Sequence, residues 1–320
     1  MKLTFLGTSS ATPTRKRNVS ALALTFVQRG VWWLFDCGEG TQHQILRSPL
    51  KLGRLEKIFI THLHGDHVFG LPGLLASRSL ADSADEPLTI YGPTGVKRFV
   101  EGALGVTGTR LAYPLRIVEI GKTAGISTVL DEAGVRVDCA PMRHGTTAYG
   151  YAVVEADKAG RLDVERLREL GVPPGPDYAR IKAGETVILA DGRSIDGREF
   201  VGPAITGRKI AICGDTMPTP NIALLARDAD VLVHEATFME EDRELADRAN
   251  HSTARQAAQA AVDANAGVLI LTHFSPRYDA ADNQRMPDLL AEARALFPST
   301  LLAEDLWTFD IKPHVDGGDS

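Results

Sequence analysis

Short hydrophobic runs recur along the chain, separated by segments rich in glycine, proline and charged residues. Many of these runs are dominated by valine, isoleucine and phenylalanine, which suit the half-buried surface of a pleated sheet. The strands predicted in this way are Leu3–Leu6, Ala21–Val27, Val31–Phe35, Lys57–Ile60, Leu88–Tyr91, Leu115–Ile120, Val135–Ala140, Tyr149–Val154, Lys209–Cys213, Val231–His234, Val268–Thr272 and Trp307–Ile311. Between the second and third of them, Gln28-Arg29-Gly30 predicts a hairpin turn.

Helical patterns lie between the strands, where apolar residues recur at intervals of three and four. The predicted helices are Pro72–Ser79, Val96–Leu104, Asp163–Leu170, Ile222–Arg227, Thr253–Ala264 and Met286–Ala295. A capping box from Thr253 to Gln256 predicts the start of the fifth helix, since its two side chains satisfy exposed backbone N–H groups. Gly267 is expected to mark the end of that helix.

This order of elements predicts an α/β fold. Strand clusters that look antiparallel, with helices around them, indicate two packed sheets sandwiched by helices. The segment 155–199 does not fit such a core, because it carries eight Lys/Arg and ten Asp/Glu. It is interpreted as a helix, a proline-rich turn and a short hairpin around residues 190–193. A solvated surface excursion and an arm that holds a macromolecule both remain open for it.

Composition narrows the class of protein. The 320 residues are 44% hydrophobic and 24% charged, as in ordinary globular domains. The net charge of −6 argues against a generally basic nucleic-acid binder, although residues 1–60 carry nine Lys/Arg against three Asp/Glu. Three widely spaced cysteines imply no disulfide framework and fit a reducing cytoplasm. No signal-peptide pattern and no apolar run near the roughly 20 residues of a membrane span is evident.

The densest chemistry follows the predicted strand Lys57–Ile60. There the chain reads His62-Leu63-His64-Gly65-Asp66-His67, which places three histidines and one carboxylate within six positions. His62 and His64 can face one metal ion if the chain is extended. Gly65 permits a sharp turn that returns Asp66 and His67 toward a second ion. Four potential ligands in one loop exceed what one tetrahedral metal needs, so two ions and hydrolysis of a phosphoester or related bond are indicated.

Further ligands are expected at the ends of other strands. His144 and His273 are the natural additions, one for each ion, because the loop alone cannot complete both coordination shells. Asp215 follows the strand that ends at Cys213, and its two carboxylate oxygens could bridge the ions. A histidine considered singly is more often a surface or core residue, but beside the H-x-H-x-D-H array that reading is disfavoured.

These motifs resemble the metallo-β-lactamase superfamily and, more narrowly, the ribonuclease Z family of tRNA 3′ endonucleases. The resemblance covers nearly the whole chain and is carried by Asp36-Cys37-Gly38-Glu39-Gly40-Thr41-Gln42, His234-Glu235-Ala236-Thr237, His251-Ser252-Thr253 and His273-Phe274-Ser275-Pro276-Arg277-Tyr278. It implies a four-layer αββα sandwich, formed by a single domain of residues 1–320, with a projecting flexible arm at 155–199. It also implies removal of the 3′ trailer from precursor tRNA, leaving a 3′-hydroxyl on the tRNA and a 5′-phosphate on the trailer.

The resemblance assigns roles to the candidate residues. It implies that one zinc ion is held by His62, His64 and His144, and a second by Asp66, His67 and His273, with Asp215 shared. Asp66 would also accept a proton from the attacking water. His251 and Glu235 would protonate the leaving oxygen, although His251 could instead be a plain helix-start residue. Mn²⁺ or Fe²⁺ would also suit these ligands.

Substrate contacts are implied in two places. Pro13–Asn18 resembles the family loop P-x-K-x-R-N, with Arg15 where the pattern has lysine, so its contacts with the tRNA end are expected from Arg15, Arg17 and Asn18. In the arm, Arg180 and Lys182 are candidates. The resemblance also implies a homodimer, while the cysteine usage and the absence of a long apolar run lead us to expect a cytoplasmic protein with no membrane association. A small-molecule hydrolase of the same fold, such as a phosphodiesterase or lactonase, is the alternative.

Overall fold

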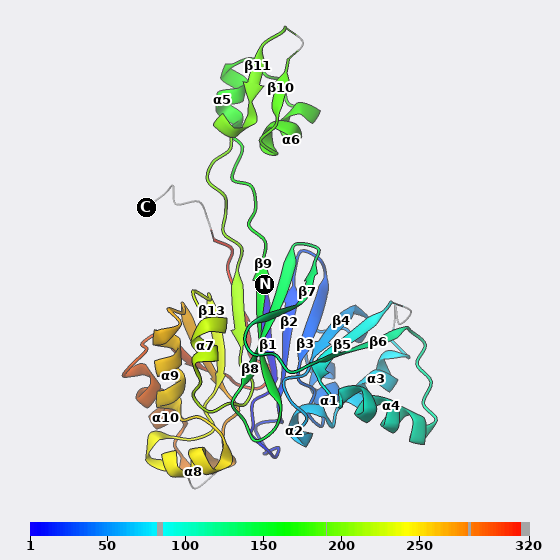
Figure 1. The fold of residues 1–320 in the computed structure, drawn as a ribbon, viewed down its shortest axis with the longest axis vertical. Coiled ribbons are helices and arrows are strands. Elements are labelled where there is room, and N and C mark those ends of the chain that lie inside the picture. Colours follow the sequence, from blue (N-terminus) through cyan, green and yellow to red (C-terminus); the bar gives the residue numbers. More distant parts are fainter. Residues whose placement is uncertain (82–85, 190, 281–282, 315–320) are drawn as a thin grey trace. The chain divides into compact units, whose positions relative to one another are not determined.

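Two seven-stranded sheets build the protein, whose computed structural model describes residues 1–81, 86–189, 191–280 and 283–314 (Figure 1). The first sheet runs in the order β18 (Thr308–Asp310), β1 (Lys2–Gly7), β2 (Ala21–Phe26), β3 (Val31–Phe35), β4 (Leu55–Phe59), β5 (Leu88–Pro93) and β6 (Leu115–Ile120). The second runs in the order β17 (Thr300–Leu302), β14 (Val268–Thr272), β13 (Val231–Glu235), β12 (Lys209–Ile212), β9 (Ala148–Glu155), β8 (Val135–Met142) and β7 (Ser127–Glu132).

Helices cover the outer face of each sheet. Buried residues of the first sheet pack with α1 (Thr41–Leu46), α2 (Gly65–Val68), α3 (Leu71–Arg78) and α4 (Val96–Thr107). The second sheet packs with α7 (Pro220–Leu225), α9 (Ala254–Asp263) and α10 (Met286–Arg294). The remaining elements of this part are α8 (Arg243–Ala249), β15 (Asp279–Ala280), β16 (Asn283–Gln284) and the 3₁₀ turns Leu52–Arg54, Glu240–Asp242 and Pro276–Tyr278.

The core between the sheets is rich in aromatic side chains. Phe35, Phe59 and Tyr91 stack in a row, with ring centroids 5.1 and 4.9 Å apart. Tyr151 of the second sheet meets Phe59 at 5.3 Å and donates a hydrogen bond to the Ile60 carbonyl. These large side chains fix the spacing between the two sheets. The expected four-layer αββα arrangement is therefore confirmed.

The predicted strands and helices of this part are all present, and the differences have physical causes. The elements that were not predicted are short or lie at a sheet edge and therefore show little periodicity; they are α1, α2, α8, β7, β15, β16 and β17. The capping box of Thr253 and Gln256 is present. The prediction that Gly267 ends α9 is wrong, because the left-handed residue is Asn265, with φ 51°.

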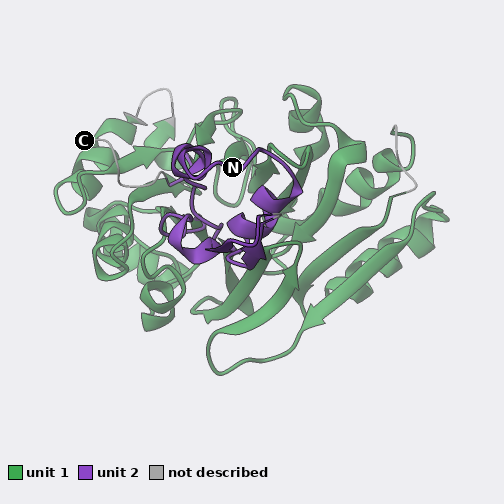
Figure 2. Ribbon diagram, turned by 90° about the horizontal axis from the view of Figure 1, so that it is seen from above, with its two compact units in different colours: residues 1–154, 209–311 green, residues 155–208, 312–320 purple. Residues whose placement is uncertain are grey.

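The described residues of 155–208, with 312–314, form a second compact unit (Figure 2). The described part of this unit contains α5 (Val164–Glu169), α6 (Pro176–Lys182), β10 (Thr186–Ile188), β11 (Ser194–Asp196) and the 3₁₀ turn Gly197–Glu199. The predicted helix and hairpin are found, whereas α6 was missed because Pro176 obscured a helix that it in fact begins. Ala190, part of the predicted turn, lies outside the described residues. The unit has its own apolar core, including Leu167, Ile181 and Phe200.

Among the described residues, no helix is long and apolar enough to span a bilayer. The three cysteines, Cys37, Cys139 and Cys213, are free thiols and all are buried. Burial raises the pKa of the Cys139 thiol to about 11 and that of Cys213 to about 12. These thiols are consequently protonated and shielded near neutral pH.

Candidate metal centre

The candidate ligands meet at one edge of the sandwich because the strands that carry them end there. The pair β3 and β4 is parallel, as are β12, β13 and β14. Carboxyl ends of parallel strands lie along a common edge, where α/β proteins place their sites. The H-x-H-x-D-H loop follows β4, Asp215 follows β12 and His273 follows β14, while Glu235 is the last residue of β13. His144 follows β8, which lies in the same sheet as β12, β13 and β14.

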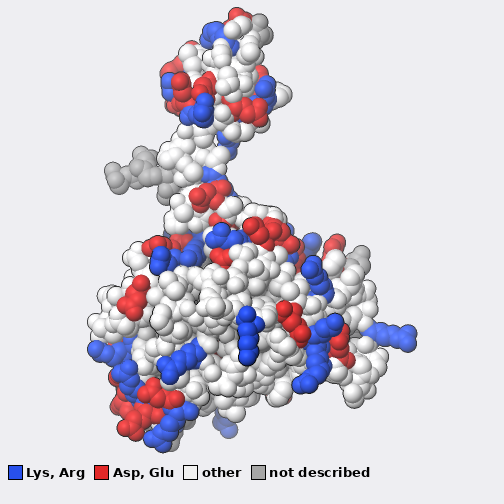
Figure 3. Space-filling model, in the orientation of Figure 1, with Lys and Arg blue, Asp and Glu red and all other residues white. Residues whose placement is uncertain are grey.

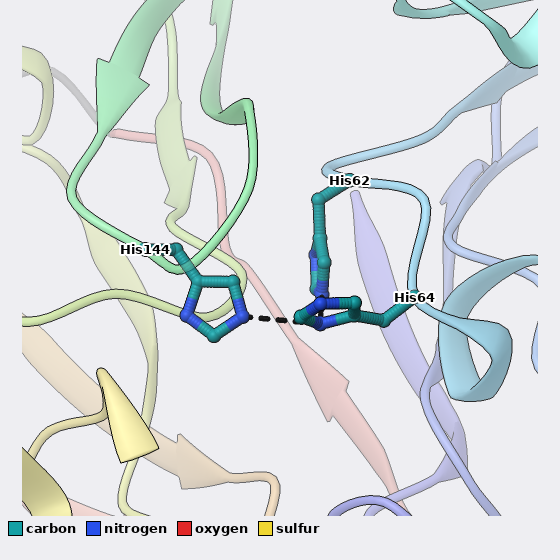
Figure 4. Close-up of side chains that lie close together, drawn as sticks. All are labelled: His62, His64 and His144. Carbon is teal, nitrogen blue, oxygen red and sulfur yellow. Dashed lines mark hydrogen bonds between the residues drawn. The ribbon is translucent and has the colours of Figure 1, made fainter. Parts of the chain in front are cut away.

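Three histidines form the first group. His62 Nε2 lies 3.0 Å from His64 Nδ1, and His144 Nε2 lies 3.2 Å from the same atom. His62 and His64 come from the loop after β4, and His144 comes from the loop after β8 (Figure 4). The three imidazoles therefore converge from two sheets on one point, with ligand atoms within 4.8 Å of one another.

A second group contains Asp66, His67 and His273. Asp66 Oδ2 lies 3.5 Å from His67 Nε2 and 3.4 Å from His273 Nε2. Asp215 lies between the two groups, because its Oδ2 is 3.3 Å from both of these nitrogens and 3.7 Å from His62 Nε2. The structure thus brings together all seven residues that the sequence analysis selected as ligands.

Most of these histidines are oriented by a partner on the ring nitrogen that faces away from the group. The Nδ1 contacts are His62 to Thr61 Oγ1 at 3.0 Å, His67 to Asp36 Oδ2 at 2.7 Å, His144 to the Asn250 carbonyl at 2.8 Å and His273 to Thr237 Oγ1 at 2.9 Å. In each of these four rings, Nε2 is left facing the other ligands. Partners of this kind are characteristic of histidines that bind metal.

The arrangement fits a metal better than a network of hydrogen bonds. His67 Nε2 is buried and has no hydrogen-bond partner among the described residues, although buried polar atoms are nearly always paired. Burial opposes the imidazolium of His67, but Asp215 and Asp36 outweigh it and hold its pKa well above the usual range. Burial lowers the pKa of His62, with a further contribution from His67. Divalent cations would satisfy these crowded nitrogens and the carboxylates together.

His251 and Glu235 form a pair beside the ligands. His251 Nδ1 lies 2.8 Å from Glu235 Oε1 and 4.0 Å from Asp215 Oδ2. Glu235 is buried and also accepts hydrogen bonds from the Thr216 N–H and the Thr237 hydroxyl. Burial disfavours the charged imidazole, but the Glu235 carboxylate outweighs it and raises the pKa of His251 to about 9.

Two supporting residues had no predicted role. Asp36 accepts hydrogen bonds from the Thr61 N–H and hydroxyl in addition to its contact with His67. Thr237 contacts both Glu235 and His273. Both lie in the quoted motifs, which were the only sequence signal available. Asp36 and His273 have φ angles of 57° and 58°, in a region that residues other than glycine seldom occupy.

In the loop Pro13–Asn18, the three residues predicted to contact substrate differ in how exposed their side chains are. Arg15 is exposed, whereas Arg17 is buried and donates to Thr8, Asp279 and the Ala303 carbonyl. The Asn18 amide donates to the Glu39 carbonyl at 2.8 Å. Of the three residues predicted to contact substrate here, only Arg15 has a side chain directed mainly to solvent.

In the second unit, Arg180 and Lys182 both lie on α6. Arg180 is paired with Glu185 at 3.0 Å and with Asp177 at 3.6 Å, and Lys182 is exposed. Lys/Arg and Asp/Glu side chains alternate over the visible surface of this unit (Figure 3). A uniformly basic face is therefore not seen in that view.

This chain is similar to known proteins in both sequence and structure. Residues 178–274 match the model of the beta-lactamase superfamily domain, and residues 1–102 match that of the anti-Pycsar protein Apyc1. Ribonuclease Z from Bacillus licheniformis is 51% identical over 98% of this chain and 99% of its own, and that from Brevibacillus brevis is 50% identical over 98% and 97%. The crystal structure of the short form of human tRNase Z superposes with a TM-score of 0.71 at 32% identity, covering 98% of this chain and all of that one.

The fold and the clustered ligands define a metal-dependent hydrolase of the metallo-β-lactamase class. Identity near 50% over almost the full length narrows the class further. The chain belongs to the ribonuclease Z family.

Proposed function

We propose that this protein is an endoribonuclease that removes the 3′ trailer from precursor tRNA, leaving a 3′-hydroxyl on the tRNA and a 5′-phosphate on the trailer. The observation that carries the proposal is the pair of ligand groups joined by Asp215, in a chain about half identical to proteins named ribonuclease Z. Two neighbouring cations suit the hydrolysis of an anionic phosphodiester.

The proposed cofactor is a pair of Zn²⁺ ions. His62, His64 and His144 would hold one ion, and Asp66, His67 and His273 the other, with Asp215 shared. Bound ions would neutralise phosphate oxygens and make a water molecule more acidic. Histidine and carboxylate ligands accept Mn²⁺ as well, so metal analysis of the purified protein is needed to identify the ion.

Proton transfers fall to side chains of the chain itself. Asp66 is the proposed acceptor of a proton from the attacking water, since its carboxylate faces the ligand groups. His251 is the proposed donor to the leaving 3′-oxygen, with its Nδ1 2.8 Å from Glu235 Oε1. Glu235 keeps this imidazole oriented and favours its charged form.

Binding of tRNA is assigned to two surfaces. Arg15 in the loop Pro13–Asn18 would contact the acceptor end, while Arg17 and Asn18 would shape that loop from within. The segment 155–199, as an arm inserted into one domain of residues 1–320, would contact the body of the tRNA through Arg180 and Lys182. A cytoplasmic homodimer is also proposed, and light scattering in solution tests the dimer against the monomer mass of 34.5 kDa.

The decisive experiment uses purified protein and a 5′-labelled precursor tRNA, with and without a chelator. Cleavage at the junction of the acceptor stem and the trailer, with a 3′-hydroxyl on the tRNA and loss of activity on chelation, is the expected result. Hydrolysis of bis(p-nitrophenyl) phosphate with no cleavage of precursor tRNA would instead favour the small-molecule hydrolase and refute the proposal.

A further inference from the structure

The loop that precedes β2 touches the metal centre through its backbone. The Ala11 N–H donates a 2.8 Å hydrogen bond to Asp66 Oδ2, the same oxygen that faces His67 and His273. Ala11 has a φ of 59°, so the loop holds this residue in a conformation that alanine seldom adopts. The position of the Asp66 carboxylate therefore depends on how this loop is held.

Arg17 is the main anchor of the loop. Its Nε lies 3.0 Å from Asp279 Oδ2, and its Nη1 donates at 2.8 Å both to Thr8 Oγ1 and to the Ala303 carbonyl. The guanidinium also lies over the ring of Phe274, 4.9 Å from its centroid. With 9% of its surface exposed, Arg17 ties the loop to three separate segments of the protein.

A second set of bonds supports this anchor. The Thr8 hydroxyl accepts a hydrogen bond from Arg17 and donates one to Asp305 Oδ1 at 2.7 Å. The other oxygen, Asp305 Oδ2, accepts from the Asn18 N–H at 2.6 Å. The Gln44 side chain donates to the same Asp305 oxygen. A network with buried members in this arrangement favours a single geometry.

The loop is also bonded to the chain next to His273. The Ser10 N–H donates to the Phe274 carbonyl at 3.0 Å, and the Phe274 N–H donates to the Thr8 carbonyl at 2.9 Å. Arg17 packs on the ring of that same Phe274. Arg17 therefore supports both the loop that carries Ala11 and the segment next to His273.

We propose that Arg17 is a positioning residue for Asp66, which acts by holding the Ala11 N–H on the carboxylate, and that it does not contact tRNA. The Arg17 guanidinium is paired with Asp279 and hydrogen-bonded within the surrounding network, whereas Arg15 in the same loop is exposed to solvent. The mechanistic consequence rests on the proposed function of the centre, but the structural link does not.

Arginine is required here for its shape as well as its charge. Its planar fork donates in fixed directions, which suits one carboxylate, one hydroxyl and one carbonyl at the same time. Lysine would keep the charge but could not reproduce these bonds together with the stacking on Phe274. Arg17→Lys is therefore expected to behave like Arg17→Gln.

The test compares kcat and KM of Arg17→Gln and Arg17→Lys on precursor tRNA and on bis(p-nitrophenyl) phosphate. A misplaced Asp66 should lower kcat on both substrates by a similar factor, about 10- to 100-fold, with little change in KM for tRNA. Arg29→Gln is the matched control and should change nothing, since Arg29 also pairs with a carboxylate and lies over a ring, but at the hairpin between β2 and β3. Arg15→Gln should raise KM for precursor tRNA.

A second measurement does not depend on activity. Amide hydrogen exchange at Ala11 in the metal-free protein should accelerate at least tenfold in Arg17→Gln and stay unchanged in Arg29→Gln. If Arg17→Gln does not fold, Asp279→Asn carries the test, because it weakens one bond of the guanidinium and should give the same pattern at smaller amplitude.

The inference is overturned if Arg17→Lys is fully active, if the loss is confined to KM for tRNA, or if Ala11 exchange is unaffected by loss of Arg17. Failure of the proposed function leaves a different signature. In that case precursor tRNA is not cleaved by the unaltered protein, while the effects of Arg17 on exchange and on the small phosphodiester persist.

Discussion

At the scale of single residues, Asp215 is the point where the two ligand groups meet. Its Oδ2 approaches three imidazole nitrogens that come from both sheets. The sequence alone could select Asp215 because it follows a buried strand closely in a chain that also has an H-x-H-x-D-H loop. A carboxylate in that position is expected to bind metal. Its distances to the histidines depend on the packing of the two sheets and could not be predicted.

Replacement of Asp215 tests this bridging position. Asp215→Ala should lower the bound metal from two equivalents and reduce cleavage at least 1,000-fold, an order of magnitude typical for loss of catalytic metal chemistry. Binding of precursor tRNA should persist, because the proposed tRNA contacts lie elsewhere. Elemental analysis and a gel-shift assay measure the two effects, and normal cleavage by the variant would contradict the assignment.

His251 should behave differently from a ligand. His251→Ala is expected to slow cleavage about 100- to 10,000-fold, the usual contribution of a proton donor, while the metal content stays unchanged. A substrate with a more acidic leaving group should recover part of the lost rate. His64→Ala is the matched comparison, since it should lose metal, and equal metal loss in both variants would make His251 a ligand.

Single residues also show what the sequence does not determine. Arg17 was predicted to contact substrate because the loop Pro13–Asn18 resembles the family loop P-x-K-x-R-N, and in the structure its guanidinium is buried against Phe274 and Asp279. These partners are more than 250 positions away in the sequence. Local patterns report charge and periodicity, and they carry no information on contacts between such distant segments.

At the scale of elements, the start of α9 was predictable because its signal is local. Thr253 and Gln256 cap each other, and the Thr253 hydroxyl also donates to Glu240 at 2.7 Å. The end of the helix was not predictable from Gly267, because Asn265 provides the left-handed conformation first.

Loss of the cap should be measurable. Thr253→Ala is expected to lower the free energy of unfolding by about 1 kcal/mol, whereas Thr253→Ser, which keeps the hydroxyl, should have little effect. Urea unfolding of both variants compares their midpoints. Equal midpoints for alanine and serine would show that the cap does not limit stability.

The second compact unit provides a test at the same scale. Lys158 and Ile205 form an antiparallel bridge, so their backbones are adjacent and a short glycine–serine turn can replace residues 159–204. This deletion should abolish cleavage of precursor tRNA and preserve hydrolysis of bis(p-nitrophenyl) phosphate. Retained tRNA cleavage would exclude the proposed role of the unit in binding, and circular dichroism verifies that the shortened protein is folded.

At the scale of the whole molecule, the metal centre joins the two sheets. Four candidate ligands follow β4 in the first sheet, and three come from loops after strands of the second. The αββα arrangement was predictable from the order of strands and helices and from family resemblance. The edge of the sheets at which the ligands meet is set by which strands are parallel. The sequence does not reveal which strands pair in parallel.

Bound metal should therefore stabilise the whole fold. An ion present at about 100 times its dissociation constant adds roughly 2.7 kcal/mol to the free energy of unfolding. Addition of a chelator is expected to lower Tm by several degrees, and excess Zn²⁺ should restore it. Calorimetry with chelator already saturated with calcium is the control, and an unchanged Tm would argue against a centre that links the sheets.

The three buried thiols have a practical consequence for experiments on this protein. Cys37, Cys139 and Cys213 are all shielded, and burial keeps them protonated. A cysteine introduced at Ile188, which is 74% exposed on β10, would be the sole thiol open to a maleimide dye in the native state. Fluorescence from that single label would then report directly on encounters between the second unit and RNA, without removal of any native cysteine.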